Sequence, residues 1–395
     1  MEHARSGVYT CNGEKMPVFI FVFLTLFGFS NFYVFLRGWQ AIPPGAGIRP
    51  VYAVLYWIAA LSFIGGRVFE TVLHSRVAEI LTWIGSFWIA ALIYLFLAVF
   101  VIDAFRVVNH FLPFIPACVT DNYARVKCLA ACAVSGTVVL ILLCGVINAR
   151  IPRVKEFEIF IDKQAGELKS LNIVMVSDTH LGTIVGRSWL ASIVDKINAL
   201  SPDIVLLAGD VLDGETGPLV RKDMGVELKR IRARYGVFSV MGNHEYFGGG
   251  DLAGRYLEEH NIKVLRDGSV KIADSFYIIG REDRSANRRF GQTRKELKDL
   301  ADALDKRFPV ILLDHQPFDL HEAAENGVDL QLSGHTHYGQ MWPVNFIVRA
   351  IYELAWGYKR IGNTHYYVSG GVCTWGPPVR TTNRPEIVNI RLSFQ

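Results

Sequence analysis

The chain has little cysteine after residue 150 and little charge before it. Of its six cysteines only Cys373 follows residue 150, so that half has no internal disulfide and no thiolate metal site is expected there. The formal net charge is only +4, which indicates no nucleic-acid partner. Long stretches before residue 150 carry no charge, although 20% of the chain is charged. This asymmetry indicates a membrane part followed by a soluble part.

Three uncharged apolar runs, residues 16–36, 80–102 and 128–149, are long enough to cross a bilayer, which takes about 20 residues. Residues 50–66 form a shorter fourth run, which extends to residue 73 if Arg67 and Glu70 snorkel or face a partner helix. A cleaved signal peptide is the alternative for residues 16–36, but no small-residue cleavage site follows. We expect an all-α transmembrane region of about four helices over residues 1–150.

Four spans would make the chain a multi-pass protein of the cell membrane, with its N-terminus and C-terminal half on one side. Six basic residues lie on that side, Arg5, Lys15, Arg76, Arg150, Arg153 and Lys155. Five lie in the opposite loops, Arg37, Arg49, Arg106, Arg125 and Lys127. The positive-inside rule therefore favours a cytoplasmic C-terminal half by one residue.

After residue 150 the pattern changes to short apolar runs separated by helical stretches. Five runs are expected to be strands, at residues 171–176, 204–208, 237–241, 310–313 and 328–332. Helical spacing after an N-cap at Ser188 predicts a helix, and Leu297, Leu300 and Leu304 predict another. The sequence thus predicts an α/β domain at 171–395, preceded at 151–170 by a linker and the strand that enters the domain.

Each predicted strand ends in metal-binding residue types. The residues are Asp178 and His180, then Asp210 and Asp213, then Asn243 and His244, then Asp314 and His315, and finally His335 and His337. Alone, each motif could be a capped turn or a polar loop. Together they converge on one edge of the sheet and exceed what one zinc ion needs. Two divalent ions, Mn, Fe or Zn, would use them all and could deprotonate a bridging water that attacks a phosphoryl group.

In these residues the sequence resembles the calcineurin-like metallophosphoesterase superfamily. Its ordered signature is Asp-x-His, Gly-Asp-x-x-Asp, Gly-Asn-His-Asp/Glu, a lone His and Gly-His-x-His, and all five elements occur here in order. The resemblance implies a four-layer αββα sandwich. It implies one metal on Asp178, His180, Asp210 and His337. It implies a second on Asp210, Asn243, His315 and His335, with Asp210 as the bridge.

The resemblance also implies roles outside the two ligand sets. His244 would contact the phosphate and protonate the leaving oxygen, and Asp213 and Asp314 would orient ligands. Residues 178–182, 339–340, 370–380 and 385–387 are similar to the membrane-linked bacterial branch of the superfamily. Tyr338 and Cys373 depart from that branch, because they stand where glycine is common, and they should narrow the pocket. Arg281 and Asp283 begin a loop that we expect to reach the site.

The sequence therefore predicts a membrane-anchored, metal-dependent phosphoesterase. A phosphodiester or pyrophosphate bond of a lipid-linked substrate is the most natural target, because tethering raises its local concentration. A membrane sensor or scaffold that binds metal without turnover is the alternative, although the ligand set is intact. A transporter with a regulatory hydrolase has little support, because only Arg67 and Glu70 are charged inside an expected span.

Overall fold

The computed structural model describes residues 15–73, 76–214, 216–286, 291 and 293–395. The residues fall into two compact units. One comprises residues up to Leu61 together with Ala91–Val139, and the other comprises Ser62–Ala90 together with Leu140–Gln395. Arg5 and Cys11, and the side chains of Arg67 and Glu70, lie outside the described part.

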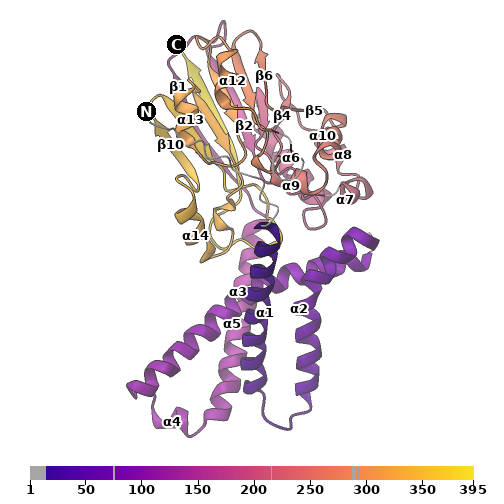
Figure 1. Ribbon diagram of the computed structural model, residues 1–395, viewed down its shortest axis with the longest axis vertical. Coiled ribbons are helices and arrows are strands. Elements are labelled where there is room, and N and C mark those ends of the chain that lie inside the picture. The colour runs from indigo at the N-terminus through magenta and orange to yellow at the C-terminus, as the bar shows by residue number, and fades with distance from the viewer. Residues whose placement is uncertain (1–14, 74–75, 215, 287–290, 292) are drawn as a thin grey trace, which may run out of the picture. The chain divides into compact units, whose positions relative to one another are not determined.

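Four long apolar helices precede the sheets, as predicted. They are α1 (Lys15–Ala41), α2 (Ile48–Leu73), α3 (Arg76–Phe111) and α5 (Tyr123–Ala149), with the short α4 (Ala117–Thr120) before the last. Each contains a stretch long and apolar enough to cross a membrane (Figure 1). The chain is therefore a membrane protein.

Helix α3 runs beyond the predicted end of its apolar run at residue 102. Asp103, where the uncharged run stops, accepts a hydrogen bond from the Tyr33 hydroxyl at 2.6 Å and pairs with Arg37 Nε at 2.8 Å. Pairing offsets the cost of a carboxylate beside apolar surface, so the helix can continue through it.

The C-terminal half contains two six-stranded sheets (Figure 1). The first has the order β1-β12-β2-β3-β4-β5, with bounds Arg153–Ile161, Glu386–Phe394, Ser170–Val176, Ile204–Leu207, Val237–Ser239 and Ile262–Val264. The second has the order β10-β11-β9-β8-β7-β6, with bounds Gly357–Ile361, Thr364–Val368, Leu330–Ser333, Val310–Leu313, Phe276–Gly280 and Gly268–Ile272. Strands β2, β3 and β4 are parallel neighbours, as are β7, β8 and β9. The carboxyl ends of these strands, which the predicted site residues follow, therefore lie at one edge of each sheet.

Alternation along the strands makes the C-terminal half a four-layer sandwich. In β2, Ile173 and Met175 point into the core between the sheets, while Val174 points into a second core beneath the helices. Helices α6 (Arg187–Ala199), α8 (Gly225–Leu228) and α10 (Gly250–Glu259) contribute to that second core. Helices α12 (Leu297–Asp302) and α13 (Leu320–Glu325) pack against the outer face of the other sheet. The predicted αββα architecture is confirmed.

Several predicted boundaries are wrong. The N-cap of α6 is Gly186 rather than Ser188, with no side-chain cap, and Ser188 lies inside the first turn. Helix α12 ends at Asp302, so Leu304 lies outside it, although Leu304 still packs against the outer core. Strands β3 and β4 stop at Leu207 and Ser239, before the predicted ends, because the chain there already turns towards the site.

Candidate metal centre

The predicted ligands lie in loops at the carboxyl ends of strands from both sheets. Hydrogen bonds between backbone groups tie neighbouring loops together, from Asp178 N to Gly209 O at 3.1 Å and from His180 N to Asp210 O at 3.0 Å. The two sheets are joined where His335 N donates to Asp178 Oδ1 at 3.0 Å. These hydrogen bonds therefore join the loops of both sheets into one site.

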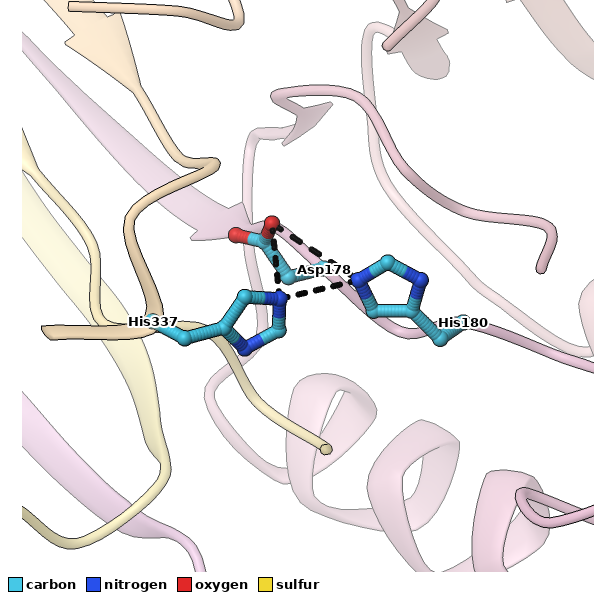
Figure 2. A group of neighbouring side chains, drawn as sticks. All are labelled: Asp178, His180 and His337. Carbon is cyan, nitrogen blue, oxygen red and sulfur yellow. Dashed lines mark hydrogen bonds and ion pairs between the residues drawn. The ribbon is translucent and has the colours of Figure 1, made fainter. Parts of the chain in front are cut away.

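Asp178, His180 and His337 form the first group of ligand atoms, and all three are buried (Figure 2). The Nε2 atoms of the two imidazoles are 2.9 Å apart. Asp178 Oδ1 lies 3.5 Å from His337 Nε2 and 3.9 Å from His180 Nε2. Two nitrogens and one carboxylate oxygen thus face a common point.

Asp210, His315, His335 and Asn243 form the second group. His315 Nδ1 donates to the carbonyl of Ala208 at 2.7 Å, which directs Nε2 towards the site. That Nε2 faces Asp210 Oδ2 at 3.2 Å and, among the described residues, has no hydrogen-bond partner. His335 Nδ1 lies 2.8 Å from Asn243 Oδ1.

Asp210 lies between the two groups. Its Oδ2 is 3.2 Å from His315 Nε2 and 3.7 Å from His180 Nε2, while its Oδ1 accepts from His244 N at 2.9 Å. One carboxylate therefore faces a nitrogen from each group. This is the arrangement that a pair of cations sharing one ligand requires.

The electrostatics of the site fit divalent cations. Burial lowers the pKa of His335 to about 3, helped by the charge of His315. Burial, His180 and Arg380 hold the pKa of His337 well below its usual value. Both imidazoles are therefore neutral near pH 7, and each has a nitrogen lone pair that can bind a metal ion. Burial would raise the pKa of Asp210, but His315, His244 and His180 hold it well below its usual value, so its carboxylate is charged.

His244 lies beside both groups but has different partners. It is part of α9 (Asn243–Phe247), and its Nδ1 is 3.1 Å from Asp213 Oδ1. Its ring packs edge to face against Phe247 and Trp375, with centroids 4.9 and 5.6 Å away. Burial lowers the pKa of His244, but the carboxylates of Asp210 and Asp213 outweigh it and raise the pKa above its usual value.

Comparison with other protein sequences finds relatives of this chain. Residues 171–339 match the family described as calcineurin-like phosphoesterase. An uncharacterized metallophosphoesterase of Helicobacter pylori (strain ATCC 700392 / 26695) is 34% identical over 61% of this chain and 64% of its own length. A Danio rerio transmembrane protein with metallophosphoesterase domain is 32% identical over 63% of this chain and 59% of its own length.

A third relative decides the assignment. An uncharacterized metallophosphoesterase of Aquifex aeolicus (strain VF5) is 34% identical over 61% of this chain and 91% of its own length. The chain belongs to the calcineurin-like metallophosphoesterase family. The match covers less than two thirds of the Helicobacter pylori and Danio rerio proteins.

The other predicted site residues of this metallophosphoesterase take different positions. Asp213 Oδ1 is 3.5 Å from His180 Nδ1 as well as close to His244, so it contacts one predicted ligand. Asp314 pairs with Arg294 and, at 3.5 Å, with Arg281. In these described contacts the Asp314 side chain binds two arginines and no side chain of a predicted ligand.

Arg281, Asp283 and Tyr338 belong to neither group of predicted ligands. Arg281 is buried, and its Nη1 binds Glu322 Oε2 at 2.7 Å. Asp283 is buried and accepts from Gln316 Nε2 at 2.9 Å. The ring of Tyr338 packs on Trp356, with centroids 5.1 Å apart. Cys373 is buried, and its backbone N donates to the carbonyl of Asp178 at 3.4 Å.

The sequence did not assign roles to Glu245 and Arg380. The buried carboxylate of Glu245 accepts from the backbone N of Gly242 at 2.7 Å, Leu212 at 2.8 Å and Asp210 at 3.1 Å. Arg380 is fully buried, and its Nη2 lies 3.2 Å from His337 Nδ1. Glu245 stands three residues after the N-cap Gly242, the position from which a Glu side chain accepts from the N-cap backbone N, and this spacing could have suggested its role. Arg380 ends the stretch 370–380, but nothing in that stretch predicts its contact with His337.

Several of the predicted ligands have backbone conformations that residues other than glycine rarely adopt. The residues with left-handed φ include Asp178, His180, Asp210, His335 and His337, at 56°, 44°, 50°, 72° and 46°. Such a conformation costs on the order of 1 kcal/mol or more at each residue. The loops maintain it because hydrogen bonds from both sheets fix the backbone there.

Proposed function

We propose that this metallophosphoesterase is a membrane-anchored, dinuclear-metal enzyme that hydrolyses a phosphodiester or pyrophosphate bond. The observation that carries the proposal is the position of Asp210, whose Oδ2 faces both His315 Nε2 at 3.2 Å and His180 Nε2 at 3.7 Å. A single cation would use the ligand atoms of only one of the two groups.

Each group would hold one ion, with Asp210 shared. The ligands of the first would be Asp178, His180, Asp210 and His337, and those of the second Asp210, Asn243, His315 and His335. Oxygen and imidazole nitrogen donors suit Mn, Fe or Zn. Two bound ions would activate a water molecule and neutralise the phosphoryl oxygens during in-line displacement.

His244 would donate a proton to the oxygen of the leaving group. Its raised pKa favours the protonated imidazole, which is the form that a general acid needs. Asp213 holds Nδ1 at 3.1 Å, and Phe247 and Trp375 restrict the ring on its sides, so the remaining nitrogen has a fixed direction.

A lipid-linked substrate is favoured by two features. The chain has four candidate membrane spans, so the site is tethered at a bilayer. Phe247 and Trp375, which contact His244, keep about half of their surface exposed and offer an apolar wall beside the site. We place the protein in the cell membrane as a multi-pass protein, with its catalytic half on the cytoplasmic side.

The test compares two substrates for the full chain reconstituted in vesicles with Mn. One substrate is a lipid pyrophosphate carried in the vesicle, and the other is a soluble chromogenic phosphodiester. We expect faster turnover of the lipid, no turnover by Asp210→Asn, and a loss of about 10²–10⁴-fold in His244→Ala. Turnover of the soluble ester alone would contradict the lipid assignment. Bound metal without turnover of either would favour the sensor or scaffold function.

A further inference from the structure

Helix α14 (Val344–Ile351) has an inverted burial pattern. Among its eight residues only the polar Asn345 is buried, whereas Phe346, Ile347 and Ile351 are 56%, 62% and 57% exposed. Phe346 and the exposed Ala350 are four residues apart, as are Ile347 and Ile351, and these two neighbouring rows together cover one broad side of the helix. Trp342, two residues before the helix, is also half exposed. The helix therefore presents a continuous apolar face outward.

The helix is attached directly to the ligand loop. It follows the short 3₁₀ turn His337–Gly339, which contains the ligand His337. Gly339 has φ +69°, and a Cβ there would lie 2.5 Å from Asn345 N, so glycine is what lets the helix start pack against the turn. The position of α14 is therefore fixed relative to the metal centre.

The start of α14 is also linked to the end of the last apolar helix. The final residues of α5, Leu140–Ala149, belong to the same compact unit as the sheets. Asn148 Nδ2 donates to Arg380 O at 3.0 Å, and Arg380 N donates to Gly145 O at 3.0 Å. In the same loop, Thr381 Oγ1 accepts from Trp342 N at 2.9 Å.

The length of α5 places that link near the membrane surface. Its 27 residues, Tyr123–Ala149, span about 40 Å at about 1.5 Å per residue. Arg125 and Lys127 lie in its first turns, and the uncharged run 128–149 that follows matches a hydrocarbon core about 30 Å thick. Asn148, at the end of this run and next to Arg150, therefore lies at the level of the lipid headgroups. The loop around Arg380 and Thr381 must then lie at the same level as Asn148.

We propose that α14 is an interfacial helix, lying in the surface of the bilayer that α5 crosses. Phe346, Ile347 and Ile351 would insert at the boundary between headgroups and acyl chains. Trp342 would lie among the headgroups, and Arg349, exposed at the edge of the apolar face, would meet their phosphates. The helix would hold the loop of His335 and His337 against the membrane, whether or not the site turns over.

The test uses the full chain with Cys11, Cys118, Cys128, Cys132 and Cys144 replaced by serine and the buried Cys373 retained. A single cysteine is introduced at Ile347→Cys and labelled with the environment-sensitive fluorophore NBD. The protein is reconstituted in vesicles of phosphatidylcholine and phosphatidylglycerol, with and without lipids that carry a nitroxide near the headgroup. Arg307→Cys is the matched control, because its side chain is 88% exposed and it precedes the amino end of β8.

We expect NBD at position 347 to emit at shorter wavelength than NBD at position 307, and to be quenched by the nitroxide lipids while the control is not. Phe346→Cys should repeat the result, with metal content and thermal midpoint equal to those of the parent protein. Emission at 347 that matches the solvent-exposed control would overturn the proposal. A blue shift without quenching by lipid would also overturn it, because protein, such as a second copy of the chain, would then cover the helix.

Discussion

The Nδ1 atom of His244 lies 3.1 Å from Oδ1 of Asp213, a carboxylate that is also 3.5 Å from Nδ1 of the ligand His180. One side chain thus contacts both the proposed proton donor and a proposed metal ligand. Its negative charge favours the protonated form of His244, and this explains part of the raised pKa of that imidazole.

Replacement of Asp213 by asparagine should shift the pH dependence of turnover. Because the carboxylate raises the pKa of His244, its loss lowers that pKa. The imidazole then loses its proton at lower pH, and the alkaline limb of the rate profile moves to lower pH. Rate profiles of wild type, Asp213→Asn and the exposed control Asp299→Asn, with metal content measured at each pH, check this. An alkaline limb that stays in place in Asp213→Asn would exclude His244 as the acid.

Replacement of Glu245 by glutamine should weaken metal binding without removing a ligand. The carboxylate accepts from the backbone N of Asp210, Gly242 and Leu212, so it fixes the loop of the shared ligand. An amide would turn its own N–H groups towards these donors. We expect metal affinity and turnover to fall about 10–100-fold. Titration of the metal-free protein with Mn measures this, with Glu258→Gln on the exposed face of α10 as control. Equal affinities in both variants would refute this role.

Replacement of Gly334 by alanine should displace the ligand Asp178. A Cβ at position 334 would lie 2.5 Å from Asp178 Oδ2 and 2.7 Å from Ser177 Cβ. We expect a lower thermal midpoint, equivalent to about 1–3 kcal/mol, together with weaker metal binding. Gly254→Ala in α10, where a Cβ has nothing within 4 Å, should leave both unchanged or raise the midpoint. Similar behaviour of the two variants would show that Asp178 does not need this close approach.

Local sequence patterns predict most of the candidate site because its residues come directly after strands in the sequence. Strand β8 has the predicted bounds, Val310–Leu313, and His315 comes two residues after it. The pairing of β1 with β12 was beyond such patterns, because the partners Arg153 and Glu386 are far apart in sequence. The role of Arg380 depends on the same distant packing.

Burial of apolar residues is also not local information. The segment Val344–Ile351 is strongly apolar, and no helix is predicted there from the sequence. In the fold it buries Asn345 and exposes Phe346 and Ile347, because the side that carries Asn345 packs against the turn His337–Gly339. The N-cap of α6 is Gly186 and not the predicted Ser188 for a related reason. The backbone at Gly186 is already extended, so the helix begins there without a side-chain cap.

The central claim, two cations that share Asp210, is tested most directly by counting metal. The full chain is stripped with chelator, equilibrated with Mn, freed of unbound ions and analysed for metal per chain, beside His335→Asn and Asp210→Asn. We expect two ions in wild type, one in His335→Asn, and loss of at least one ion together with turnover in Asp210→Asn. Wild type that binds no ion, or Asp210→Asn that retains two, would contradict it.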